Sequence, residues 1–327
     1  MENQIEIKNL TKSFGSHVVL KDVNLNIPSQ KIFGIIGESG SGKTTLLKTI
    51  IGFWHFDNGQ IMYEGRNLEK DRNFIKQIVG FATQDNCVYP KLTVKENLEY
   101  FGSLSNVPSG TLKGNIEKVI RFVNLQDSTN KLAENLSGGM QRRLDIACAL
   151  VHNPKILILD EPTEDLDPLL RRDILNLIRK INLNETTVII TSHLLHEAEQ
   201  LCDNIAILHQ GCVLKYGSPE HLKDSYTKDE EIHLITKNKN YDKLIKLLKN
   251  KQKVSNIEKL GRKIVIYTKE AEPILSLLLS ELKKEKDRII QIDVRRPSLG
   301  EVFENLIKKS DGVKKGEQAS NNNQEKL

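Results

Sequence analysis

The chain of 327 residues has no apolar run long enough to cross a bilayer. The longest candidate, PILSLLLSEL at residues 273–282, falls short of the roughly 18–20 residues that a spanning helix needs. The first ten residues, MENQIEIKNL, lack the basic and then apolar pattern of a secretory signal. We therefore expect a cytoplasmic protein that reaches the cell membrane only peripherally, through a partner.

Cysteine is scarce, with four residues in the chain. No two of them form a Cys-x-x-Cys pair, and no His stands at metal-ligand spacing from them. We expect isolated, reduced thiols, which excludes a disulfide scaffold.

Aromatic residues are few where the chain is basic. Residues 1–227 carry a net charge of −2, and residues 228–327 carry +7. A basic region can bind nucleic acid or an anionic membrane surface. Here the basic residues are scattered among Glu and Asp with almost no aromatics between them, which favours a lysine-rich solvated face. We expect no nucleic-acid partner.

Strand and helix patterns alternate over the first two thirds of the chain. Several short, continuous apolar runs are typical of strands buried on both faces. They are residues 32–36, 156–159 and 187–191. Residues 167–181 have helical spacing and begin with Asp-Pro. This order predicts a mostly parallel α/β sheet, followed by an antiparallel hairpin at 205–217.

The composition changes near residue 225, where SYTKDEE is typical of a linker. Three strand patterns and three helix patterns follow. The strands are 231–236, 263–268 and 289–294, and the helices are 241–250, 272–285 and 299–309. We therefore predict a first domain at 1–225 and a small α+β domain at 226–309. Residues 310–327 have almost no core-forming side chains, and we expect them to be disordered.

The stretch GESGSGKTT matches the phosphate-binding pattern G-x-x-x-x-G-K-[ST] between a predicted strand and a predicted helix. Glycines let backbone N–H groups point at phosphate oxygens, and the helix N-terminus adds partial positive charge. Lys43 can reach the β- and γ-phosphates, and the Thr44 hydroxyl can bind Mg²⁺. The predicted loop residues are Gly37, Glu38, Ser39, Gly40, Ser41, Gly42, Lys43, Thr44 and Thr45.

Polar side chains follow the two later buried strands. Asp160 can hold Mg²⁺, and Glu161 can accept a proton from a water that attacks the γ-phosphate. His193 can bond to the γ-phosphate and orient that water. Two further residues are weak signals alone. Gln84 has a neutral amide that can contact Mg²⁺ or the water, and Phe14 can stack on a base, although by itself it fits a core residue.

A second glycine-bearing loop occurs at LSGGMQ, residues 136–141. Ser137, Gly138 and Gly139 lead directly into a helical pattern, which makes another anion-binding helix N-terminus. One nucleotide needs only one such cradle, so this loop requires a separate explanation.

These motifs in this order resemble the ATP-binding subunits of ABC transporters over residues 4–225. The resemblance implies a P-loop NTPase core with an antiparallel β subdomain and a helical subdomain near 85–150. It implies that Phe14 stacks on adenine and that Gln84 lies beside the groove that receives the membrane-spanning permease subunit. It also implies a sandwich dimer, expected to join identical chains, in which Ser137, Gly138, Gly139 and Gln141 cap the partner's ATP, and it places Asp167 among the nucleotide-binding residues.

The C-terminal sequence RRPSLGEVFENLIKK resembles the end of ABC-2-type, drug-exporter-like ATP-binding subunits, which pair with a separate membrane protein. One departure from the family is Glu164-Asp165, because Gly usually stands before the Leu-Asp of this loop. If that position takes a positive φ, Asp is among the better-tolerated replacements. Two extra carboxylates near a triphosphate are expected to affect the hydrolysis rate more than the fold.

Two other functions fit part of the pattern. A soluble ABC-family ATPase acting on ribosomes or DNA usually has two ATPase halves or long coiled-coil insertions, and this chain has neither. A purely regulatory binding module is disfavoured because Glu161 and His193 are both present. The sequence therefore favours an ATP-hydrolysing subunit of an exporter, with ATP and Mg²⁺ as its ligands.

Overall fold

The computed structural model describes residues 3–226, 229–249 and 251–310. The predicted disordered tail lies outside these residues, apart from residue 310. The chain divides into two compact units, Met1–Pro219 and Glu220–Leu327.

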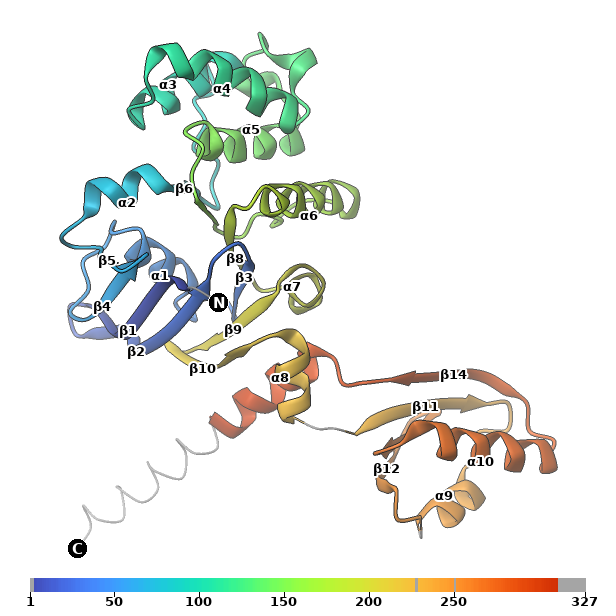
Figure 1. Ribbon diagram of the computed structural model, residues 1–327. Helices are drawn as coiled ribbons and strands as arrows, with labels where there is room; N and C mark the ends of the chain where they lie inside the picture. The colour runs from blue at the N-terminus through green and yellow to red at the C-terminus, as the bar shows by residue number, and fades with distance from the viewer. Residues whose placement is uncertain (1–2, 227–228, 250, 311–327) are drawn as a thin grey trace, which may run out of the picture. The chain divides into compact units, whose positions relative to one another are not determined.

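A six-stranded sheet forms the centre of the first unit, in the order β10-β9-β3-β8-β7-β6 (Figure 1). Its strands are β3 (Ile32–Ile36), β6 (Val79–Ala82), β7 (Ile156–Leu159), β8 (Thr187–Ser192), β9 (Asn204–His209) and β10 (Cys212–Gly217). All neighbours are parallel except β9 and β10, which form the predicted antiparallel hairpin. Every residue of β3, β7 and β8 is buried, which explains the largely apolar character of their sequences.

A second, antiparallel sheet has the order β2-β1-β4-β5. Its strands are β1 (Asn3–Phe14), β2 (His17–Pro28), β4 (Asn58–Tyr63) and β5 (Arg66–Asn67). Helix α1 (Lys43–Ile50) contributes Leu46, Leu47 and Ile50 to the hydrophobic cluster that this sheet shares with β3 and β7. The phosphate loop between β3 and α1 is thus held at the junction of the two sheets.

Helices occupy the chain between β6 and β7, and two more follow β7 and β8 (Figure 1). They are α2 (Arg72–Ile78, before β6), α3 (Val94–Leu104), α4 (Ser109–Phe122), α5 (Gly138–Leu150), α6 (Pro168–Leu183) and α7 (Leu195–Leu201), with short 3₁₀ turns η1 (Gln126–Ser128) and η2 (Ala133–Asn135). Thr93 and Glu96 form a capping box that begins α3. Within the described part of the chain, no helix combines the length and apolar character needed to cross a membrane.

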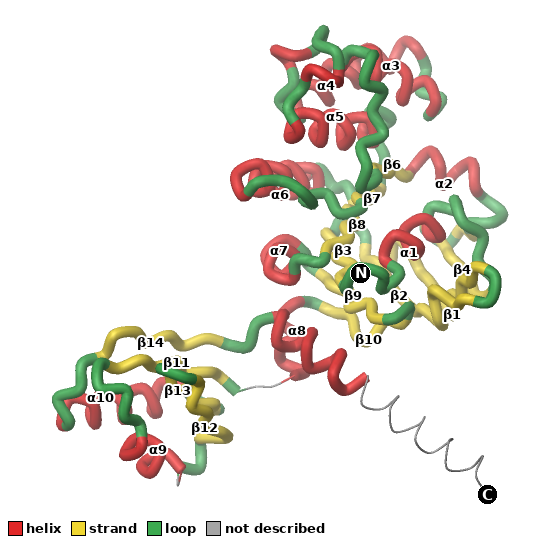
Figure 2. The backbone as a smooth tube through the Cα atoms, turned by 180° about the vertical axis from the view of Figure 1, so that it is seen from behind, coloured by secondary structure: helices red, strands yellow, loops and turns green. Residues whose placement is uncertain are grey.

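The second unit contains a four-stranded antiparallel sheet in the order β12-β13-β11-β14. Its elements are β11 (Glu230–Thr236), α9 (Asp242–Lys249), β12 (Val254–Leu260), β13 (Lys263–Thr268), α10 (Ala271–Lys284) and β14 (Ile289–Arg295), with α8 (Pro219–Tyr226) before them and a helix at 299–310 after them. Helices α9 and α10 cover one face of the sheet (Figure 2).

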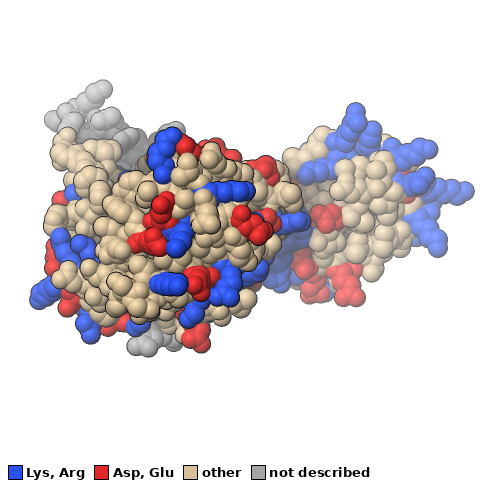
Figure 3. Space-filling view, turned by 90° about the horizontal axis from the view of Figure 1, so that it is seen from above, with Lys and Arg blue, Asp and Glu red and all other residues tan. Residues whose placement is uncertain are grey.

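Three of these strands match the predicted pattern, and β12 was not predicted because none of its residues is fully buried. Lys and Arg side chains gather at one end of this unit on the face seen in Figure 3. This gathering agrees with the positive net charge of residues 228–327.

Candidate nucleotide-binding site

The loop between β3 and α1 has the backbone that a phosphate cradle needs. Gly40 and Gly42 adopt φ values of +80° and +107°, which favour glycine. A Cβ atom at Gly37 would lie 2.3 Å from the Leu208 carbonyl oxygen, so only glycine fits there. The loop leads into the N-terminus of α1 at Lys43, where backbone N–H groups lack helical partners.

A pocket of about 370 Å³ opens over this loop. It brings together eight of the predicted site residues from three parts of the chain. They are Ser39, Gly40, Gly42, Lys43, Thr44, Thr45, Gln84 and Glu161. His17 and Val19, which were not predicted, and Glu164, whose carboxylate was expected near the triphosphate, complete the lining.

Lys43 is almost buried and has three close oxygen neighbours. Its Nζ donates to the carbonyl oxygens of Gly37 at 2.9 Å and Glu38 at 3.2 Å. It also lies 3.2 Å from Oε1 of Glu161. These contacts hold the ammonium group at the floor of the loop, where it can meet a phosphate.

Glu161 is positioned by its neighbours on three sides. Its backbone N–H donates to the Thr191 hydroxyl at 2.8 Å, and its Oε2 lies 3.1 Å from Nδ1 of His193. Its φ of +45° is uncommon for a residue other than glycine, and such backbone strain collects at functional sites. The strand ends thus bring Glu161 and His193 together in the way that their positions after β7 and β8 predict.

Asp160 is deeper than Glu161 and 2% exposed. Its Oδ1 accepts a hydrogen bond of 2.6 Å from the Thr191 hydroxyl, which orients the carboxylate. Thr44 and Gln84 line the pocket, so this region offers hydroxyl, amide and carboxylate oxygens. Magnesium prefers such hard oxygen ligands, and it typically takes few protein groups because phosphates and waters complete its shell. The donor set therefore fits Mg²⁺.

Ser41 supplies an independent sign of a polar ligand. Its residue is 5% exposed, and its hydroxyl has no hydrogen-bond partner among the described residues. Buried hydroxyl groups normally have a partner. A triphosphate in the loop would offer acceptor oxygens to this group.

The second glycine loop does not line this pocket. Ser137 is the N-cap of α5 and accepts a hydrogen bond from the Met140 N–H, and Gln141 donates to the Ala133 carbonyl. A Cβ at Gly139 would lie 2.7 Å from Leu170, whereas a Cβ at Gly138 would meet open space. The N-terminus of α5 is therefore capped by its own Ser137, and none of these loop residues lines the pocket of its own chain.

Asp167 and Phe14 also lie outside the pocket lining. The Asp167 carboxylate caps α6 by accepting from the N–H groups of Leu169 and Leu170. Asp165, the residue that replaces the usual glycine, adopts a φ of +57°. The condition under which Asp was expected to be tolerated is therefore met. Phe14 is 41% exposed and packs edge-to-face on Trp54.

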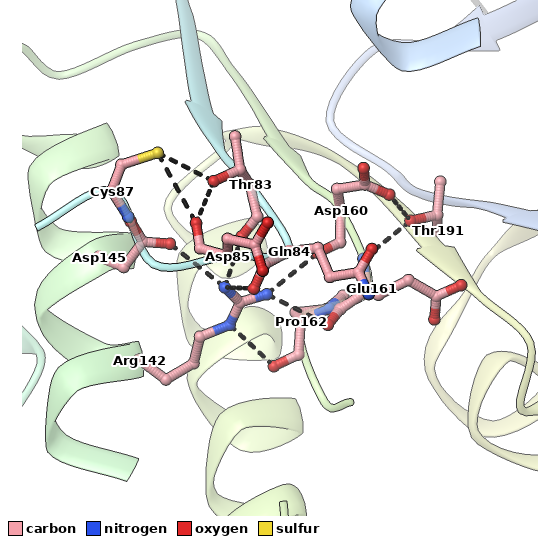
Figure 4. A network of polar contacts seen from close by, with 10 residues as sticks. All are labelled: Thr83, Gln84, Asp85, Cys87, Arg142, Asp145, Asp160, Glu161, Pro162 and Thr191. Atoms are coloured by element: carbon pink, nitrogen blue, oxygen red, sulfur yellow. Dashed lines mark hydrogen bonds and ion pairs between the residues drawn. The ribbon is translucent and has the colours of Figure 1, made fainter. Parts of the chain in front are cut away.

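Arg142, which sequence reasoning missed, connects three parts of the site (Figure 4). Its guanidinium donates to the carbonyl oxygens of Thr83, Gln84, Asp160, Glu161 and Pro162. It also pairs with Asp145 at 3.3 Å. The only sequence signal is its place in MQRR directly after the second loop, and that place does not reveal which carbonyls it reaches.

Burial shifts the pKa values of both Arg142 and Asp145. Burial lowers the pKa of Arg142, although nearby carboxylates oppose this. Burial raises the pKa of Asp145 to about 6, although the Cys87 N–H and Arg142 both favour its ionised form. Asp145 is thus a buried carboxyl group that titrates near neutral pH, outside the pocket itself.

Two family models match the chain. The model described as "ABC transporter" matches residues 20–164, and the model described as "ATP-binding protein DrrA1-3-like, C-terminal domain" matches residues 217–307. The first contains the phosphate loop, Gln84 and Glu161. The second covers most of the second unit.

Curated relatives extend over nearly the whole chain. The linearmycin resistance ATP-binding protein LnrL of Bacillus subtilis is 32% identical over 92% of this chain and 97% of its own length. The bacitracin transport ATP-binding protein BcrA of Bacillus licheniformis is 37% identical over 73% of this chain and 78% of its own length. A Nod factor export ATP-binding protein I of Rhizobium sp. strain N33 is 30% identical over 91% and 95% of the two chains.

Solved structures match 68% of this chain, a length that corresponds to the first unit. A nucleotide-free ATP-binding cassette from an ABC transporter is 26% identical, covers 68% of this chain and 94% of its own, and has a TM-score of 0.62. An ATP-binding subunit of an ABC transporter gives 25% identity and the same TM-score over 68% and 93% of the chains. The expected α/β P-loop fold is thereby confirmed.

Proposed function

The chain belongs to the ATP-binding subunits of ABC transporters, and from this premise we propose that it drives an ABC-2-type exporter by hydrolysing ATP. The relatives named for linearmycin resistance, bacitracin transport and Nod factor export support the exporter class. The single pocket that gathers Lys43, Thr44, Gln84 and Glu161 carries the proposal.

The residues that line this pocket, together with Asp160 beside Glu161, divide the chemistry among them. The N–H groups of the loop and Lys43 bind the phosphates. Thr44, Gln84 and Asp160 would hold Mg²⁺, which when bound neutralises charge on the β- and γ-phosphates. Glu161 accepts a proton from the water whose oxygen attacks the γ-phosphorus. The bond to the β–γ bridging oxygen then breaks, and its electron pair stays with ADP.

His193 positions Glu161 for this step. Its Nδ1 contacts Oε2 of Glu161, whereas Lys43 contacts Oε1. The two carboxylate oxygens therefore have different partners, so the group has little freedom to rotate. A fixed base accelerates proton transfer more than a mobile one, because it requires no reorganisation during the reaction.

A second copy of the chain completes each site in this proposal. Ser137, Gly138, Gly139 and Gln141 lie outside their own chain's pocket and surround a helix N-terminus suited to phosphate. Asp167 is expected at the contact between the two copies. ATP then joins two identical subunits, and hydrolysis lets them separate.

The permease contact is proposed beside Gln84, on the cytoplasmic face of the membrane. Tyr89 and Tyr100 form an exposed pair there, with ring centroids 4.8 Å apart and a hydrogen bond of 3.1 Å between their hydroxyls. Exposed aromatic residues are common anchors of protein interfaces. A helix of the membrane subunit that packs on this pair would also touch the chain segment that carries Gln84.

Co-purification from membranes tests this function. The full-length tagged chain should retain a multi-spanning membrane protein, and Tyr100→Asp should weaken that retention while leaving basal ATPase activity unchanged. Tyr216→Asp is the matched control, since Tyr216 is 41% exposed and Tyr100 is 40% exposed. Recovery of ribosomes or DNA in place of a membrane protein would contradict the transporter assignment.

A further inference from the structure

Trp54 has no part in the function proposed so far, yet it is the one ring that packs edge-to-face on Phe14 in the described structure. The two ring centroids lie 5.3 Å apart at 86°. We propose that Trp54 is a positioning residue that fixes the Phe14 ring for stacking on the base of the nucleotide. This inference rests on the adenine-binding role proposed for Phe14.

The turn that carries Trp54 is tied to the phosphate loop through α1. The N–H groups of Phe53 and Trp54 both donate to the Lys48 carbonyl, at 2.9 and 3.1 Å. Gly52, with φ of +75°, ends the helix. Helix α1 begins at Lys43, so the same rigid element sets the position of the phosphates and of the Trp54 ring.

The same turn is also tied to the strand that ends at Phe14. The Asp57 N–H donates to the Thr11 carbonyl at 2.8 Å, and the Asp57 carboxylate accepts from the Ser13 N–H. Lys12 lies 4.0 Å from Asp57 and 4.8 Å from the centroid of the Phe14 ring. The turn thus connects two supports of the nucleotide, one for the base and one for the phosphates, and Trp54 is the residue of this turn that contacts the Phe14 ring.

An exposed Phe side chain without such a neighbour would lose rotamer freedom when it stacks on a base. The edge-to-face contact orders the ring before the nucleotide arrives, which lowers the cost of binding. Trp54→Ala should therefore weaken ATP binding by about 3- to 10-fold. Trp54→Phe keeps an aromatic edge at this place and should restore most of the affinity.

Binding of two ligands separates a positioning role from a general structural role. Equilibrium binding of ATP and of inorganic tripolyphosphate is measured on the full-length chain in EDTA, which prevents turnover. Trp54→Ala and Phe14→Ala should both weaken ATP binding and leave tripolyphosphate binding unchanged. Loss of binding for both ligands would show a damaged phosphate loop and overturn the inference. Tyr216→Ala, which removes a ring that is 41% exposed on β10, should alter neither.

A double-mutant cycle gives the decisive comparison. If Trp54 acts through Phe14, Trp54→Ala should have no further effect on ATP affinity in a Phe14→Ala background. An equal loss in both backgrounds would mean that Trp54 contacts the nucleotide independently, and the inference fails. If Phe14→Ala itself leaves ATP binding unchanged, the adenine role of Phe14 is wrong. If only Trp54→Ala is without effect, the positioning role alone is wrong. Because Trp54 is the only tryptophan of the chain, its fluorescence should also change with ATP and not with tripolyphosphate.

Discussion

Nζ of Lys43 lies 3.2 Å from Oε1 of Glu161, so the proposed phosphate ligand and the proposed base form an ion pair. Both side chains are at most 10% exposed. The Lys43 ammonium group donates to the two loop carbonyls and pairs electrostatically with Glu161. A γ-phosphate that binds Lys43 would share the ammonium group with Glu161, while His193 contacts the other carboxylate oxygen.

Glu161→Gln should bind ATP at least as tightly as the wild type while hydrolysis falls about 100-fold or more. The amide cannot accept the proton, and it removes a negative charge beside the triphosphate and beside Lys43. Single-turnover hydrolysis and equilibrium ATP binding measure the two effects. Glu164→Gln, which neutralises another carboxylate of the pocket lining, should still hydrolyse ATP because it leaves the proposed base in place. Turnover of Glu161→Gln near the wild-type rate would remove Glu161 from the base role.

Mixing two inactive variants tests whether each site needs two chains. Lys43→Ala should weaken nucleotide binding, and Ser137→Arg should bind ATP as a monomer without hydrolysing it. Randomly mixed dimers of the two would contain one complete site, so activity should recover to about a quarter of the wild-type level.

The control for this recovery is Lys43→Ala mixed with the double variant Lys43→Ala/Ser137→Arg, which can form no complete site. Full activity of Ser137→Arg alone would show that one chain contains a whole site. Absence of recovery, with mixed dimers demonstrated, would also rule out the shared arrangement.

Asp165→Gly should stabilise the protein by about 0.5–1 kcal/mol, because the φ of +57° suits glycine better than aspartate. Urea unfolding measures this change. Asp165→Asn keeps a side chain that tolerates this backbone but removes the charge, so it separates conformation from electrostatics. A gain in ATPase rate shared by both variants would indicate that the charge slows hydrolysis. Loss of stability in Asp165→Gly would show that the backbone here is not strained.

The contribution of Asp145 to the free energy of unfolding should fall as the pH rises from about 4 to about 6. Burial raises the pKa of Asp145 to about 6 in the folded chain. Since the unfolded carboxyl titrates near 3.9, the folded state binds a proton that the unfolded state lacks over this window. The contribution is present below pH 4 and is lost through pH 6, up to about 3 kcal/mol in all.

The difference in unfolding free energy between wild type and Asp145→Asn should show this slope, and above pH 7 the difference should be constant. Asp173→Asn, which removes an exposed carboxylate paired with Arg143 at 2.9 Å, provides the baseline. If the free energy of unfolding of the wild type runs parallel to that of Asp145→Asn from pH 4 to 7, a protonated, buried Asp145 is contradicted.

Strands buried on both faces were the most predictable part of the fold. The run at 32–36 coincides with β3 because all five of its residues are buried and apolar. Strand β2 was not predicted, although Val23, Leu25 and Ile27 are buried and alternate with polar residues, as in a strand with one buried face. The edge strand β12 was missed because burial, the property that marks a strand in sequence, is only partial there.

The pocket was predictable to the extent that neighbouring strand ends bring side chains together. Glu161 and His193 follow adjacent parallel strands, so their contact follows from topology. His17 and Val19 reach the pocket from strand β2, which was not predicted, and Glu164 reaches it from the loop after β7. Arg142 binds backbone carbonyls, and carbonyls are present at every residue, so its partners leave no trace in sequence.

The carbonyl contacts of Arg142 have a mechanical consequence. The guanidinium belongs to α5, whose N-cap is Ser137. It donates hydrogen bonds to the carbonyl oxygens of Gln84 and Glu161. A displacement of the Gln84 segment by a membrane partner would therefore be transmitted to both Glu161 and the second glycine loop. One buried side chain would thus couple the positions of the Gln84 segment, Glu161 and the second glycine loop.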